Sequence, residues 1–173
     1  MQCLTTHNTQ CTSAADALPL VAQWKNISKA VTLKGSQLTW SMMHQFKLVE
    51  RRKRSLGLQT GWYALHTGLG DIDECNRINL EKEIKGLPTS SSLDSLRGKI
   101  VGAFHVFCKV SGASVRAKER VCYLVDAVMK IDKPIECSGK LWCWKLPPSV
   151  KSNLVDQLKK SEIRFNNINN LFM

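Results

Sequence analysis

The chain has 173 residues, of which 43% are hydrophobic and 23% are charged, and its formal net charge is +11 at pH 7. This length suffices for one globular domain that buries its own core, and the composition is that of a globular protein. No run of about eighteen apolar residues occurs, so we expect no helix that spans a membrane.

The positive charge is unevenly distributed along the chain. Residues 1–54 contain eight basic and two acidic residues, residues 55–96 contain three and six, and residues 97–173 contain fourteen and six. If the two basic segments fold onto one face, their summed potential would attract a polyanion. The alternative is a dispersed basic surface that only aids solubility.

The seven cysteines are an odd number, and no pair has the C-x-x-C spacing of zinc or redox motifs. We therefore expect reduced thiols in an intracellular protein, either cytoplasmic or nuclear, with no metal or other cofactor. A metal site built from Cys137, Cys143 and His105 has no ligand spacing to support it. Residues 1–23 lack the pattern of a secretory signal, but their Ser and Thr content leaves an organelle transit peptide open.

Residues 1–27 mix polar side chains with one short apolar patch and predict a poorly ordered leader. Alternation over residues 29–33 predicts a strand that Gly35 ends. Ser36 is expected to cap a helix over residues 37–46, with Trp40, Met43 and Phe46 on the face that packs against the core.

The stretch from Lys47 to Arg54 places one carboxylate, Glu50, among five cations, and it predicts a strand or a strand entered through a turn. Strict alternation would separate Lys47 from Glu50 and Arg52. Lys47 joins them only if it lies in the turn before the strand. A carboxylate surrounded in this way stays ionised, because neighbouring positive charge lowers its pKa.

The middle of the chain predicts two strands and a helix. Residues 62–66 have the content of a buried strand, residues 71–85 predict a helix with Asp73 and Glu74 as first-turn acids, and residues 89–95 form a serine-rich loop. Residues 99–109 predict a central strand in which His105 is a core or rim residue. Gly102 within it predicts close approach of another backbone or a ligand.

The last third predicts two more strands and a helix. Asp126 interrupts the apolar run 121–131, which favours a bent strand at a sheet edge. Over residues 141–146, period two places Trp142 and Trp144 on one face, either as core packing or, beside cations, as a base-stacking platform. Ser149 is expected to cap a helix with an inward apolar row, and residues 161–173 predict a frayed tail.

Together these pieces resemble the ASCH domain of the PUA-like superfamily. The family signature G-x-K-x-x-E-x-R follows a strand and a short helix, and here Lys47, Glu50 and Arg52 stand at the Lys, Glu and Arg positions, with Gln45 at the glycine. The later blocks are similar in order: the strand at residues 62–66 ending before Gly68, the segment 97–102, and the segment 133–144.

The resemblance implies an α+β fold, a small mixed β-barrel with flanking helices over residues 28–160, with a cleft lined by the signature residues. It also implies a role with RNA or nucleotides, and we expect a monomer. Some family members are reported as ribonucleases, and some small relatives as amidohydrolases of acetylated cytidine. Those hydrolases have a threonine where Glu50 stands, so their activity is not carried over.

The first functional hypothesis is an RNA- or nucleotide-binding module. Its expected binding residues are the charged side chains of the basic stretch and one histidine: Lys47, Glu50, Arg51, Arg52, Lys53, Arg54 and His66. The alternatives are a metal-independent hydrolase or ribonuclease acting on RNA or modified nucleosides, with Lys47 and Glu50 as catalytic candidates, and a protein-interaction adaptor. A purely structural ion pair between Glu50 and Arg52 also stays open.

Overall fold

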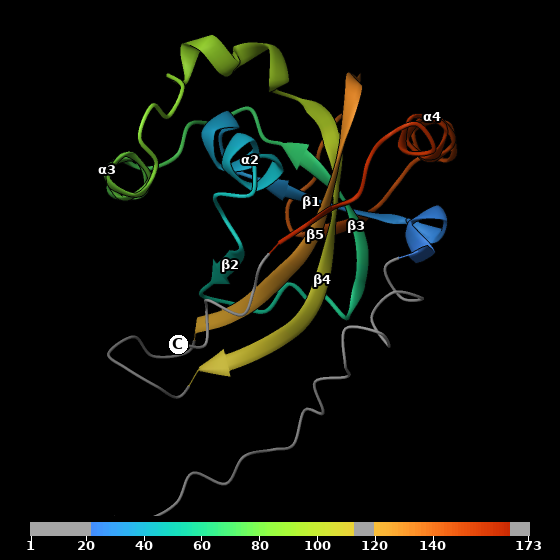
Figure 1. Ribbon diagram of the computed structural model, residues 1–173, viewed down its shortest axis with the longest axis horizontal. Coiled ribbons are helices and arrows are strands. Elements are labelled where there is room, and N and C mark those ends of the chain that lie inside the picture. Colours follow the sequence, from blue (N-terminus) through green and yellow to red (C-terminus); the bar gives the residue numbers. More distant parts are fainter. Residues whose placement is uncertain (1–21, 113–119, 167–173) are drawn as a thin grey trace, which may run out of the picture.

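The computed structural model describes residues 22–112 and 120–166. Its elements, in chain order, are the 3-10 helix η1 (Ala22–Asn26), β1 (Lys29–Leu33), α2 (Ser36–Met43), β2 (Val49–Arg52), β3 (Gly61–Thr67), α3 (Glu74–Glu83), the 3-10 helix η2 (Ser91–Leu96), β4 (Lys99–Gly112), β5 (Arg120–Glu136), β6 (Cys143–Lys145), α4 (Pro148–Leu158) and β7 (Arg164–Phe165). The fold is α+β with a curled, half-barrel-like sheet (Figure 1). The expected leader, except for its last residues, lies outside the described residues.

One mixed sheet organises the molecule. Its strand order is β2-β5-β4-β3-β1-β6, and β7 adds a short pairing to β5. Only β1 and β3 run parallel among the paired strands of the described chain. The ladder between β4 and β5 runs from Lys99↔Glu136 to Gly112↔Arg120 and has three register shifts. Because bulges bend a strand and increase its twist, these shifts account for the curl of the sheet.

The sheet is buried on both faces, and each face has its own hydrophobic core. Successive side chains of a strand point to opposite faces, so neighbouring residues enter different cores. One core joins Leu154 and Leu158 of α4 to Ala30, Ala64, Ala103 and Ala127 of four strands. The other joins Met42 and Met43 of α2 to Val31, Leu65, Phe104 and Val128 of the same strands. Figure 1 shows α2 and α4 on opposite sides of the sheet.

Gly102 of β4 confirms the prediction of a close backbone approach. A Cβ atom at this position would lie 2.2 Å from the carbonyl oxygen of Met129 and 2.7 Å from Sδ of Met43. The glycine therefore lets β5 and α2 both pack directly against β4, next to one of the register shifts.

The strand predicted over residues 121–131 is confirmed, but its predicted edge position is wrong. β5 lies between β4 on one side and β2 on the other. Asp126, which motivated the edge assignment, is buried and lies 2.7 Å from Nδ1 of His105 on β4. A buried partner in the neighbouring strand thus replaces the solvent that an edge would have provided.

The ends of two helices differ from expectation. Gly35, not Ser36, is the N-cap of α2, and Oγ of Ser36 is buried with no hydrogen-bond partner in the described chain. α2 ends at Met43, so Phe46 leaves the helical stripe and is 54% exposed. In α4 the N-cap is Pro147 and Pro148 begins the helix, in place of a Ser149 cap. Proline suits a first helical turn because its missing N–H would have no partner there.

Part of the expected tail is ordered against the sheet. Within residues 161–166, β7 pairs with β5, and the side-chain amide of Asn166 donates to the carbonyl of Val125 at 2.7 Å. Residues 167–173 lie outside the described residues. No helix in the described chain is long and apolar enough to cross a bilayer.

We predict that Gly102→Ala destabilises the fold, because its methyl group would overlap a backbone oxygen that cannot move without disturbing the β4–β5 ladder. Overpacking of this kind costs about 1–3 kcal/mol. Urea unfolding would measure the loss. Gly70→Ala is the matched control, since its Cβ would meet nothing closer than Cε of Lys34 at 3.4 Å. Equal stability of the two variants would contradict the prediction.

Candidate nucleic-acid interface

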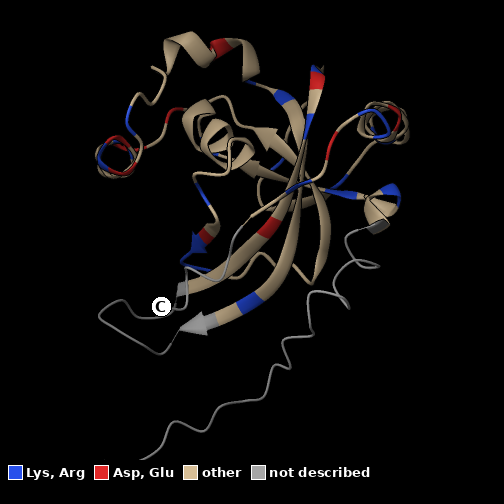
Figure 2. Ribbon diagram, viewed as in Figure 1, with Lys and Arg blue, Asp and Glu red and all other residues tan. Residues whose placement is uncertain are grey.

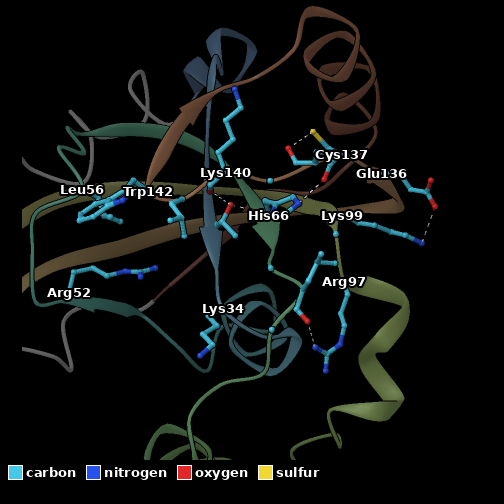
Figure 3. Close-up of a pocket in the computed structure, with 18 of the residues that line it drawn as sticks. Lys34, Arg52, Leu56, His66, Arg97, Lys99, Glu136, Cys137, Lys140 and Trp142 are labelled. Atoms are coloured by element: carbon cyan, nitrogen blue, oxygen red, sulfur yellow. Dashed lines mark hydrogen bonds and ion pairs between the residues drawn. The ribbon is translucent and has the colours of Figure 1, made fainter.

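A cleft of about 1210 Å³ opens on the molecule where the ends of several strands meet. Its walls come from the end of β1, the end of β2 with the segment that follows, the end of β3 with the loop that follows, the start of β4, and the segment between β5 and β6. The lining residues are Thr32, Lys34, Arg51–Arg54, Leu56, His66, Gly68–Gly70, Arg97–Lys99 and Glu136–Trp142. In Figure 3 Arg52, Leu56 and Trp142 lie toward one end of the cleft, and Lys99 and Glu136 toward the other.

The charge of this lining is almost entirely positive. Glu136 is the acidic residue of the lining, and the basic residues are Lys34, Arg51, Arg52, Lys53, Arg54, Arg97, Lys99 and Lys140. In Figure 2 the end of the β2 strand and the chain just after it are blue. Because the cleft is concave and lined by one sign of charge, it concentrates a positive potential.

Three of the eight cations have carboxylate partners. Arg97 pairs with Asp71 and Asp94, Lys99 lies 3.8 Å from Glu136, and Arg52 lies 2.7 Å from Glu50. Hydrogen bonds from Ser90 and from Arg97 hold the pKa of Asp71 below its ordinary value, so this carboxylate stays charged.

The other five cations have no ion pair within 4.0 Å in the part of the chain that the structure describes: Lys34, Arg51, Lys53, Arg54 and Lys140. Their charge is therefore available to an anionic ligand.

The three signature residues converge on one another. Lys47 lies in the turn before β2, where its backbone N–H and that of Phe46 both donate to the carbonyl of Ser41. From there its Nζ reaches Oε2 of Glu50 at 3.2 Å, while Nε of Arg52 lies 2.7 Å from Oε1. The Nε–H of Arg52 is not aligned for a hydrogen bond, so the contact with Glu50 is an ion pair only.

The turn before Lys47 needs a left-handed residue, and Gln45 supplies it. Gln45 has φ 65°, in the region that glycine adopts without strain. Its side-chain amide donates to the carbonyl of Phe165 at 2.8 Å and to Oδ1 of Asn166 at 2.9 Å. These two bonds to the β7 segment hold the side chain of a residue whose backbone is strained.

The expected binding residues divide into two groups. Arg51, Arg52, Lys53, Arg54 and His66 line the cleft, whereas Lys47 and Glu50 do not. Glu50 is 5% exposed, beneath the two cations that pair with it. The signature cluster thus supports one wall of the cleft and reaches the cleft itself through Arg52.

The cleft also contains basic residues that the sequence analysis did not single out: Lys34, Arg97, Lys99 and Lys140. Each of the four stands next to a glycine in the sequence: Gly35, Gly98 or Gly139. This repeated pairing of a Lys or Arg with a glycine could have pointed to these residues as candidates. It does not show which strand ends lie together around the cleft.

His66 forms part of the floor of the cleft and is 2% exposed. Its Nε2 lies 2.9 Å from the carbonyl of Cys137, which can only accept, so Nε2 carries a hydrogen. Nδ1 lies 3.2 Å from Oγ1 of Thr32. That hydroxyl donates its one hydrogen to the carbonyl of Lys140 at 2.8 Å and accepts from Nε1 of Trp144 at 3.0 Å. The network fixes the 137–140 loop onto β1 and β3.

Gly139 closes this floor. A Cβ atom at position 139 would lie 2.1 Å from Cε1 of His66. The loop backbone therefore lies directly against the imidazole. Burial lowers the pKa of His66 below its ordinary value of 6.5, against the hydrogen bond to Cys137, which raises it.

Trp142 and Trp144 do not share a face, contrary to the period-two prediction. β6 begins at Cys143, and Trp142 before it has φ 72°, which breaks the alternation. Trp144 is 7% exposed in the core, whereas Trp142 is 49% exposed and lines the cleft.

Comparison of the chain with protein-family models and with curated proteins gave no match to either.

We predict that Glu50→Gln lowers stability by about 1–2 kcal/mol, because a neutral amide leaves two partly buried cations without their counter-charge. The side chains of Lys47 and Arg52 are 19% and 30% exposed, which keeps the loss below that of a fully buried pair. Chemical denaturation would measure it. Glu81→Gln is the control, since Glu81 pairs with Arg77 but is 47% exposed. A loss no larger than that of the control would contradict the prediction.

The free energy of unfolding should depend on pH through His66. The pKa of His66 is lower in the folded than in the unfolded chain, so the unfolded chain binds a proton first as the pH falls through about 6.5. The contribution of His66 to stability is present above that pH and is lost as the pH falls toward the folded pKa.

The measurement is the free energy of unfolding from pH 7.5 to pH 5. The carboxylates with lowered pKa values, Asp71, Asp73 and Glu74, titrate below this window. His66→Gln should therefore flatten the pH dependence. An unchanged slope in the variant would show that another group is responsible.

Proposed function

We propose that this protein is an RNA- or nucleotide-binding module of PUA-like type whose ligand lies in the basic cleft. The observation that carries the proposal is the lining of that cleft, where eight cations accompany one carboxylate. Five of those cations have no ion pair in the described residues, so no described carboxylate neutralises them.

A phosphate backbone is the ligand that best fits this charge. Arg51, Arg52 and Arg54 present guanidinium groups whose paired N–H donors match phosphate oxygens. Binding of a polyanion to such a surface releases condensed counterions, which supplies much of the binding free energy. Phosphate contacts of this kind position a nucleic acid without reading its sequence.

The signature cluster supports the ASCH resemblance behind this proposal. A strand and a short helix lead into the turn, Gln45 takes the left-handed φ expected of the family glycine, and Glu50 gathers Lys47 and Arg52 around itself. We interpret Glu50 as the residue that orients Arg52 at the wall of the cleft.

The same geometry favours binding over acid–base catalysis. Each carboxylate oxygen of Glu50 faces a cation, and neither Glu50 nor Lys47 lines the cleft. A general acid or base must lie within hydrogen-bond reach of its substrate, which these two side chains do not achieve from their positions.

The test is a binding titration of a fluorescently labelled single-stranded RNA at several salt concentrations. We expect the double variant Arg51→Ala/Lys53→Ala to bind more weakly and to lower the magnitude of the slope of log K against log[salt] by about 1.4, or roughly 0.7 for each lost phosphate contact. Both side chains are exposed, so folding should be retained.

The charge-matched control is Lys85→Ala/Lys160→Ala, which removes two exposed lysines that do not line the cleft. It should keep the wild-type affinity and slope. Equal losses from both double variants would indicate a diffuse charge effect, and no binding by the wild-type protein would reject the proposed function.

A further inference from the structure

The cleft contains exposed apolar side chains as well as cations. Leu69, Leu141 and Trp142 line it and are 75%, 82% and 49% exposed. The exposed apolar surface of these side chains contributes no hydrophobic stabilisation to the fold. Their position among cations combines a π surface with positive charge, and a nucleotide has the complementary pair: a flat base and a phosphate.

Trp142 has a strained backbone and a side chain that is about half exposed. Its φ of 72° places a bulky residue in the left-handed region, which costs on the order of 1–3 kcal/mol for a non-glycine residue. This backbone conformation turns the indole away from the core that Trp144 enters. No ring contact in the described chain involves Trp142.

The neighbours of Trp142 fix this conformation from both sides. On one side, the carbonyl of Lys140 accepts from Thr32 at 2.8 Å. On the other, Cys143 pairs with Val31 in the β1–β6 ladder. The indole is therefore presented from a loop that is anchored to β1 at each end, and a preorganised ring loses little freedom when a ligand stacks on it.

We infer that the cleft takes an unpaired nucleotide whose base stacks on Trp142 while its phosphates contact the basic residues at the end of β2 and directly after it. This inference rests on the proposed function and narrows its ligand class. A base within a duplex already has both faces stacked, so duplex nucleic acid cannot use Trp142. Two sources share the chemistry, a single-stranded segment and a free nucleotide.

The experiment compares three probes with the full-length protein: a labelled single-stranded RNA of mixed sequence, the same strand annealed to its complement, and a nucleoside 5′-monophosphate as competitor. We expect tighter binding of the single strand than of the duplex. Displacement of the RNA by the monophosphate at millimolar concentration would assign the site to free nucleotides as well. Without displacement, the site belongs to single strands.

Trp142→Ala should weaken single-strand binding by about 5- to 150-fold, the range of one lost base–aromatic stack. The salt slope should stay unchanged, because no phosphate contact is removed. Trp142→Phe should retain most of the affinity. Phe165→Ala is the matched control, since it removes an aromatic side chain that is 56% exposed and does not line the cleft.

Indole fluorescence gives a second readout that does not depend on the affinity measurement. The chain has five tryptophans, and stacking of a base on Trp142 should quench the emission of one of them. That quenching should be absent in Trp142→Phe even when RNA is bound.

The outcomes separate this inference from the function on which it rests. Salt-dependent RNA binding with Trp142→Ala equal to Phe165→Ala, or with duplex bound as tightly as single strand, would overturn the stacking site and leave the basic cleft as a binding surface. Absence of any nucleic-acid or nucleotide binding by the wild-type protein would overturn both.

Discussion

The long antiparallel ladder between β4 and β5 is the constraint on which the rest of the structure depends. β5 pairs with β2 through residues 121–124 and with β4 along most of its length, and it ends at Glu136 where the cleft loop begins. One strand thereby supports both the arginine-rich wall and the loop that carries Trp142. The register shifts in this ladder curl the sheet, and a curled sheet can bring the ends of distant strands around one hollow.

The basic residues near the cleft differ in whether they have a carboxylate partner. Near the cleft, the cations with carboxylate partners hold loops in place: Arg97 joins the segment before α3 to the end of η2, and Arg52 shares Glu50 with Lys47. The unpaired cations have no structural role of this kind in the described residues, which is why we assign them to a ligand. Exposed ion pairs contribute little to stability, so the paired cations matter more for geometry than for free energy.

Two non-glycine residues of the described chain have positive φ: Gln45, in the turn ahead of β2, and Trp142, in the lining of the cleft. Gln45 shapes the turn ahead of β2, and its side chain bonds to the β7 segment, so other contacts hold its strained backbone. Trp142 lies in the lining of the cleft, and its side chain has no comparable hydrogen bond to the described residues. Residues with strained backbones cluster at functional sites. Because the side chain of Gln45 has hydrogen bonds within the fold and that of Trp142 has none to the described residues, we propose a ligand contact for Trp142 only.

The sequence by itself determined the local elements and the chemistry at their ends. Alternation predicted β1, apolar and aromatic content predicted β3 and β4, and Gly102 predicted a close approach, because these features depend on neighbours within a few residues. The same residues left open whether Lys47 lies in the turn before β2 or on the opposite face of the strand from Glu50. The tertiary structure alone decided that β5 is an inner strand and that Trp142 faces outward. It also decided that Lys34 and Lys140 line the cleft, whereas Lys47 and Glu50 do not. Those outcomes depend on strand pairings between residues far apart in the chain, such as Lys29 with Lys145 in the β1–β6 ladder. Local periodicity carries no information about such pairings.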